Sequence, residues 1–176
     1  MPSSNEIIPQ RLFDLTRIDL LSISGRGGRE RELGGLLFPS ASRASSSLYD
    51  YEISDGSIFY RVEIKKQQND QWFDIGKYFQ LSDRDREIVV LFVNHREGVI
   101  DTVAAIHLGV LVDFLLSHSE YKRYGWTLDV LRTACNLKKI DQCHELQFKA
   151  KLKVRNLIDE HRELFQIIYE RVPQQS

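Results

Sequence analysis

The stretch YDYEISDGSIFYRVEIKK, residues 49–66, has the pattern of a β-hairpin. Its central pair, Asp55-Gly56, is typical of a two-residue turn between antiparallel strands. Apolar and polar residues alternate on both sides of this turn, as they do in strands that bury one face. The pattern therefore predicts one strand at 48–54 and a second at 57–66.

The pairing of the two strands decides which side chains share a face. With Asp55-Gly56 as the turn, Glu52 is expected opposite Phe59 and Asp50 opposite Arg61. Paired residues, and residues two apart on one strand, lie on the same face. One face then collects the charged side chains of Asp50, Glu52, Glu63 and Lys65. The other face collects the apolar ones of Tyr49, Tyr51, Ile53, Ile58, Tyr60, Val62 and Ile64.

The charged face carries the parts of a hydrolytic site. Clustered carboxylates repel each other unless a cation lies between them, and a site made of oxygen ligands favours magnesium. The ammonium group of Lys65, beside Glu63, can orient an attacking water and offset charge on a phosphate. These parts suit metal-assisted phosphodiester hydrolysis. The alternative is a surface salt bridge from Lys65 to Asp50 or Glu52, which contributes about 0–1 kcal/mol.

Asp50 followed by Glu63-Ile64-Lys65 on the next strand resembles the PD-(D/E)xK nuclease superfamily. Its members share a mixed β-sheet flanked by helices and cut nucleic acids with magnesium. The segments GRERELGGLL and SRASSSLYDYEISDGSIFYRVEIKK are similar to archaeal Holliday-junction resolvases, over about residues 25–80. Compact type II restriction endonucleases use the same hairpin and commonly act as dimers. The resemblance thus implies an α/β, restriction-endonuclease-like fold.

The resemblance also implies roles for individual residues. Asp50 and Glu63 become ligands of Mg²⁺, with Mn²⁺ as a substitute, and Lys65 becomes the catalytic lysine. Glu30 becomes the acidic residue of the upstream helix. A substrate-facing loop is implied at Arg43, Ser45, Ser46 and Ser47.

Two further segments are candidates for DNA contacts. Arg26 and Arg29 lie in a glycine-rich stretch that can present amides and guanidinium groups to phosphate, or serve only as a flexible lead into a helix. At the end of the second strand, polar side chains either contact DNA or form a solvated strand end. These are Lys66, Gln67, Gln68 and Asn69.

The rest of the chain predicts further strands and a helical C-terminal extension. REIVVLFVNH is expected as a central strand, VIDTV as an edge strand, and 103–117 as a core helix. From Thr127 onward the pattern is helical, with an apolar seam suited to another helix of this chain or of a second copy. The seam is formed by Ala150, Val154, Leu157, His161, Leu164, Ile168 and Val172. We expect a nuclease core at 1–118, including an N-terminal helix within 5–21. An extension at 119–176 is expected to serve dimerisation or DNA contact.

Composition limits the partners and the compartment. The 176 residues carry a net charge of −1, which does not favour indiscriminate coating of DNA. The most apolar segment, 103–116, is too short to span a bilayer, so no membrane partner is expected. Two cysteines, Cys135 and Cys143, are too few for a disulfide framework and favour a reducing cytoplasm.

Together these features predict a magnesium-dependent DNA endonuclease acting on double-stranded or branched DNA. Neutral charge and the extra helices favour a type II restriction-like, site-specific enzyme over a Holliday-junction resolvase. Cutting two strands favours a homodimer, and a partner subunit is possible. A non-catalytic DNA-binding or assembly subunit with the same fold is the alternative of another class.

Overall fold

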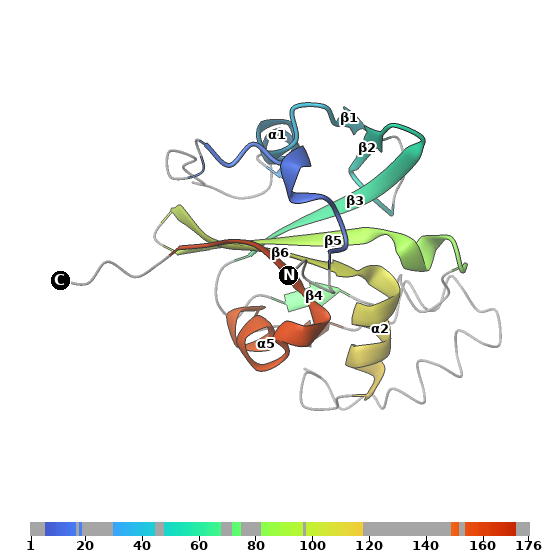
Figure 1. Cartoon of the computed structure of the whole chain (residues 1–176). Helices are drawn as coiled ribbons and strands as arrows, with labels where there is room; N and C mark the ends of the chain where they lie inside the picture. Colours follow the sequence, from blue (N-terminus) through green and yellow to red (C-terminus); the bar gives the residue numbers. More distant parts are fainter. Residues whose placement is uncertain are drawn as a thin grey trace.

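The computed structural model describes residues 6–16, 18, 30–44, 48–67, 72–74, 82–96, 98–117, 149–151 and 154–171. Its centre is a six-stranded sheet in the order β1-β2-β3-β5-β6-β8 (Figure 1). These strands are β1 (Ser42–Arg43), β2 (Tyr51–Asp55), β3 (Ile58–Gln67), β5 (Val89–Arg96), β6 (Val99–His107) and β8 (Gln166–Glu170). A second, two-stranded sheet pairs β4 (Trp72–Asp74) with β7 (Lys149–Lys151).

Helical segments accompany the sheet. The α-helices are α1 (Glu30–Leu37), α2 (Leu108–Ser117) and α5 (Val154–Glu160). Three short 3₁₀ turns are η1 (Gln10–Leu12), η4 (Asp85–Glu87) and η6 (Arg162–Leu164). β3 and β5 run parallel, whereas the other neighbouring pairs of the main sheet are antiparallel. The expectation of an α/β fold with a mixed sheet is therefore confirmed.

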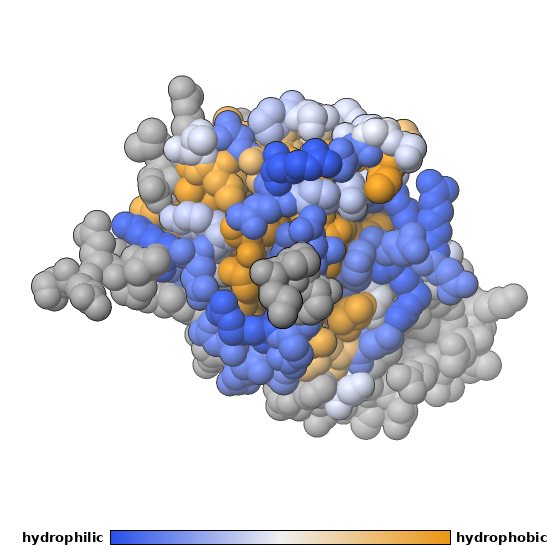
Figure 2. Space-filling view, viewed as in Figure 1, coloured by the Kyte–Doolittle hydropathy of each residue, from blue (hydrophilic) through white to orange (hydrophobic). Residues whose placement is uncertain are grey.

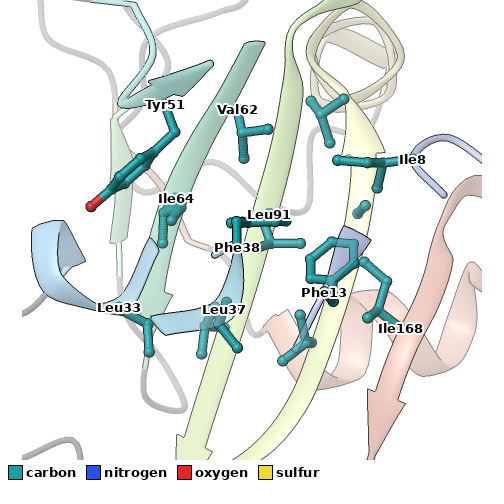
Figure 3. Close-up of a cluster of buried hydrophobic side chains, with 14 of the residues drawn as sticks. Ile8, Phe13, Leu33, Leu37, Phe38, Tyr51, Val62, Ile64, Leu91 and Ile168 are labelled. Carbon is teal, nitrogen blue, oxygen red and sulfur yellow. The ribbon is translucent and has the colours of Figure 1, made fainter. Parts of the chain in front are cut away.

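Two hydrophobic clusters cover the two faces of this sheet. On one, here named the α1 face, Leu33 and Leu37 of α1 pack against Val62 and Ile64 of β3 (Figure 3). On the other, the α2 face, residues of α2 and α5 pack against β5 and β6. Figure 1 shows α1 on one side of the sheet and α2 and α5 on the opposite side. The central strands are thus buried on both faces.

Burial on both faces explains one error in the predicted strands. REIVVLFVNH forms β5 between β3 and β6, as expected of a central strand. VIDTV is not an edge strand, because β6 lies between β5 and β8. β6 also continues to His107, so helix α2 begins at Leu108 and not at residue 103. A continuous apolar run has no two-residue period, and its pattern cannot separate a buried strand from a buried helix.

The C-terminal segment differs from the predicted long helix. α5 ends at Glu160, and residues 166–170 form β8, which pairs with β6. Leu157 belongs to the cluster on the α2 face and Ile168 to the cluster on the α1 face, so the predicted seam is not one surface. The turn η6 breaks the helical period between them. The boundary after residue 118 stays a prediction, although β8, from beyond it, completes the main sheet.

The N-terminal segment also differs from its prediction. Within 6–16 the only helical segment is η1, and no helix runs through the described part of 5–21. α1 includes both Gly34 and Gly35. The N-terminal segment is held by tertiary contacts, since the side chain of Gln166 accepts hydrogen bonds from the amides of Ile7 and Ile8 at 2.8 and 2.9 Å.

Candidate active site

The β2–β3 hairpin turns one residue later than its sequence predicts. Asp55 pairs with Ile58, so the turn consists of Gly56 and Ser57. Gly56 has φ of +64°, the left-handed conformation that the first turn residue of such hairpins requires. Glu52 therefore lies opposite Arg61 and not opposite Phe59. A change of two in the register leaves the paired side chains of β2 and β3 on their predicted faces. Tyr49 lies outside this pairing and is an exception, because it packs against the cluster on the α2 face and not with Tyr51 on the α1 face.

Glu63 and Lys65 lie on the α2 face, as predicted from the alternation. Their parallel partners on β5 are Val90 and Phe92, both members of the cluster on the α2 face. Ile64, between them, is fully buried in the cluster on the α1 face. The strand alternation thus explains why a glutamate and a lysine stand side by side in an otherwise buried strand.

Asp50 is attached to the same part of β3 by two hydrogen bonds. Its backbone amide donates to the carbonyl of Val62 at 2.9 Å, and its Oδ2 accepts from the amide of Ile64 at 2.9 Å. Ile64 is the residue between Glu63 and Lys65. The carboxylate of Asp50 is therefore held against the backbone that carries the other two candidate catalytic residues.

Glu63 and Lys65 form an ion pair. The distance from Lys65 Nζ to Glu63 Oε1 is 3.1 Å. The side chain of Lys65 is 23% exposed and that of Glu63 is 9% exposed. A carboxylate this buried needs a cation beside it, since desolvation strongly disfavours an isolated charge. Lys65 thus pairs with Glu63, whereas the alternative predicted from the sequence was a pair with Asp50 or Glu52. Glu52 Oε1 accepts a hydrogen bond from the hydroxyl of Tyr49 at 2.8 Å.

The oxygen atoms of Asp50 and Glu63 are of the chemical type that a hard divalent cation prefers. Asp50 and Glu63 supply only oxygen ligands, and Mg²⁺ is commonly held by one or two carboxylates while it keeps several waters. Within the described ranges, no group of three or more histidine, cysteine, aspartate or glutamate residues is arranged to hold a metal. A magnesium ion held by Asp50 and Glu63 alone would keep several of its waters.

The other predicted site residues are placed only in part. Glu30 is the first residue of α1, and Lys66 and Gln67 are the last two residues of β3. Arg43 is exposed in β1 opposite Tyr51, and antiparallel partners share a face, so it belongs to the α1 face and not to the face of Glu63. The remaining predicted residues lie outside the described residues, namely Arg26, Arg29, Ser45, Ser46, Ser47, Gln68 and Asn69, as do Cys135 and Cys143.

Sequence reasoning placed Phe59 and Arg61 on this face but gave them no functional role. Phe59 and Arg61 precede Glu63 and Lys65 at two-residue steps, so the strand period alone places them on one side of β3. Arg61 lies over the ring of Tyr49, with 5.5 Å from its Cζ to the ring centre. The hydrogen bond to Glu52, and secondly burial, raises the pKa of Tyr49 above its usual value.

No protein-family model, curated protein or solved structure matches this chain. Among the helices of the described residues, none is both long and apolar enough to cross a membrane. A functional assignment therefore depends on the geometry of the hairpin and not on a relative.

Proposed function

We propose that this protein is a magnesium-dependent DNA endonuclease of the PD-(D/E)xK type. The observation that carries the proposal is the hydrogen bond to Asp50 from the backbone amide of Ile64, the residue between the ion-paired Glu63 and Lys65. An aspartate just before β2, with a glutamate and a lysine on β3, supplies the oxygen ligands and the positive charge that metal-assisted phosphodiester hydrolysis can use. The mixed sheet with helices on both faces is the arrangement that the resemblance implies, and it supports the proposal.

Each residue of the cluster has a distinct role in this reaction. Asp50 and Glu63 hold the cation, which when bound offsets negative charge on the phosphate that is attacked. Burial of Glu63 fixes its carboxylate and keeps bulk water from one side of the site. Lys65 is partly exposed, and its ammonium group donates hydrogen bonds. These bonds orient the attacking water or offset negative charge on a phosphate oxygen.

Two substrate classes follow from different observations. The net charge of −1 favours a site-specific, restriction-like enzyme, because proteins that bind DNA mainly by its shape depend on extensive positive surface. Residues 166–170 form a strand of the main sheet and not part of a helical extension. The predicted difference between this chain and a compact resolvase is therefore smaller. A Holliday-junction resolvase is therefore the second candidate. In both cases we propose a cytoplasmic homodimer, since two strands must be cut.

The test uses purified protein with Mg²⁺ and two substrates, a long phage DNA and a synthetic four-way junction. Discrete fragments of linear DNA indicate a restriction-like enzyme, whereas paired nicks near the crossover indicate a resolvase. Lys65→Ala is expected to lower cleavage about 10²–10⁴-fold, the range for a proton-transfer group. Arg171→Ala removes one positive charge from an exposed position of the chain and serves as the matched control.

A second measurement separates loss of chemistry from loss of fold. Lys65→Ala leaves Glu63 buried without its ion-pair partner, so urea unfolding of the variant must accompany the cleavage assay. The double variant Lys65→Ala/Glu63→Gln removes the buried charge and is expected to recover part of the lost stability without recovering cleavage. Normal cleavage by folded Lys65→Ala would disprove the catalytic assignment. DNA binding by a wild-type protein that cuts neither substrate would favour the non-catalytic alternative.

A further inference from the structure

A groove adjoins the candidate active site on the α2 face of the hairpin. It has a volume of about 780 Å³ and is lined by the hairpin, by the segment around η4 and by the start of α2. We name it the hairpin groove and define it by Glu52, Phe59, Arg61, Arg84, His107 and Val110. Glu52 lies two residues after Asp50, and Arg61 lies two residues before Glu63. Two residues of strand span about 7 Å, so Arg61, at the groove, lies one side-chain row from Glu63 on β3.

Three large apolar side chains that line the hairpin groove are exposed. Phe59 is 71% exposed, and Ile58 and Val110, which also line the groove, are 54% and 40% exposed. Of the four large hydrophobic residues exposed in the described part of the chain, only Leu36 of α1 lies elsewhere. In Figure 2 a small orange area at the hairpin is bordered by lighter and blue surface. Exposed apolar surface rimmed by polar groups is typical of a binding site.

The charged residues of the groove differ in whether they have partners. Arg61 pairs with Asp85 at 3.2 Å, and Arg86, at the same wall, pairs with Asp113. Arg84 is exposed, and its guanidinium makes no ion pair with any described residue. The groove therefore contains the exposed aromatic ring of Phe59 and the guanidinium group of Arg84, which is not in an ion pair with a described residue.

We infer that the hairpin groove binds unpaired nucleotides of the DNA, next to the phosphate that Asp50, Glu63 and Lys65 act on. This inference rests on the catalytic part of the proposed function. In place of an intact duplex or a fully paired junction, it gives the preferred substrate as DNA with an unpaired stretch beside the cleaved bond. An aromatic ring stacks on a base whose face is open, and each such contact contributes about 1–3 kcal/mol. Bases inside an intact duplex have no open face, so Phe59 selects unpaired DNA.

The polar groups of the groove fit the same ligand. Arg84 supplies a positive charge for a backbone phosphate. The carboxylates of Glu52 and Glu87, which line the groove, can accept hydrogen bonds from the exocyclic amino groups of cytosine or adenine. An apolar protein surface placed over the same groove would bury Arg84 and both glutamates without new partners, which is costly. A nucleotide provides an anion, a flat apolar face and hydrogen-bond donors together.

The test measures binding in EDTA, where cleavage by a magnesium-dependent enzyme is absent. Fluorescence anisotropy compares a single-stranded oligonucleotide, a gapped duplex and a blunt duplex of the same length. Phe59→Ala is expected to weaken binding of the first two about 5- to 150-fold, which corresponds to one stacking contact. Arg84→Ala is expected to weaken them as well and to reduce the salt dependence of binding. Binding of the blunt duplex should not change.

Matched controls are Leu36→Ala, an exposed apolar side chain outside the groove, and Arg171→Ala, an exposed cation outside it. The inference would be overturned if Phe59→Ala and Arg84→Ala bound the gapped duplex as tightly as the wild type does. It would also be overturned if these variants lost as much affinity for the blunt duplex as for the gapped duplex. A change in sedimentation of Phe59→Ala with DNA binding intact would also overturn it and would indicate a protein contact. The proposed function fails separately, if wild type binds gapped DNA through the groove but cuts no substrate in Mg²⁺.

Discussion

The carboxylate of Asp50 accepts a hydrogen bond at 2.9 Å from the backbone amide of Ile64, the residue that separates Glu63 from Lys65. Asp50 precedes the first residue of β2, and the strand pairing with β3 starts one residue later, at Tyr51 and Val62. The carboxylate of Asp50 thus accepts a hydrogen bond from an amide of β3 that lies beyond the pairing of β3 with β2. The same contact supports the hairpin and positions a candidate metal ligand.

This contact allows the structural role of Asp50 to be separated from its chemical one. Asp50→Asn keeps an oxygen that can accept from Ile64, whereas Asp50→Ala leaves this amide without the side-chain acceptor. We expect Asp50→Ala to lower the free energy of unfolding by about 1–3 kcal/mol and Asp50→Asn by less. Both variants should lose cleavage and Mn²⁺ binding, measured by calorimetry. Full activity of Asp50→Asn would exclude Asp50 as a metal ligand.

The two adjacent glycines of α1 should respond in opposite directions to alanine. A Cβ on Gly34 would overlap the ring of Tyr51, whereas a Cβ on Gly35 would meet no atom within 4 Å. Gly35→Ala is therefore expected to stabilise the protein by about 0.5–1 kcal/mol through helix propensity. Gly34→Ala should destabilise it by about 1–3 kcal/mol through overpacking, despite the same gain in propensity. Urea unfolding of both variants checks this, and equal effects would contradict the packing of α1 on β2.

Gln166 should be required to hold the N-terminal segment on the sheet. It is 6% exposed, and besides accepting from the amides of Ile7 and Ile8 it donates from Nε2 to the carbonyl of Ile8 at 2.8 Å. Gln166→Ala removes three hydrogen bonds and leaves buried backbone groups without their partner, at a cost of about 2–4 kcal/mol. Hydrogen exchange at Ile8 should accelerate in parallel. Gln10→Ala, which removes one bond of 3.2 Å to the carbonyl of Ile168, is the milder control.

The raised pKa of Tyr49 predicts how stability changes in alkali. Its hydroxyl donates to Glu52 only while protonated, and a phenolate beside this carboxylate would be repelled. This contribution to folding is therefore complete below the unfolded tyrosine pKa of about 10 and is lost as pH rises through the higher folded value. Urea unfolding between pH 9 and 11 should show a smaller loss in Tyr49→Phe than in wild type. An unchanged slope would indicate that the bond to Glu52 does not persist in solution.

The hairpin and its faces were predictable because they depend on local alternation. Val62, Glu63, Ile64 and Lys65 alternate in type, and a register error of two residues did not change the face of any of them. The hydrogen bond between Asp50 and Ile64 was not predictable. No sequence pattern indicates that a side chain, and not a backbone carbonyl, accepts from the amide next to the end of the β2–β3 pairing. The hairpin groove also depends on α2 and η4, segments remote in sequence from Phe59 and Arg61.

By itself, the sequence determined the hairpin, the central strand β5 and the grouping of Glu63 with Lys65, since a two-residue period needs only neighbours along the chain. Tertiary structure alone decided that β6 lies inside the sheet and that residues 166–170 form a strand. The segment QIIYE ends a run whose apolar spacing also fits a helix. The strand is favoured because its backbone groups pair with those of β6. In this conformation Ile168 also joins the buried cluster on the α1 face.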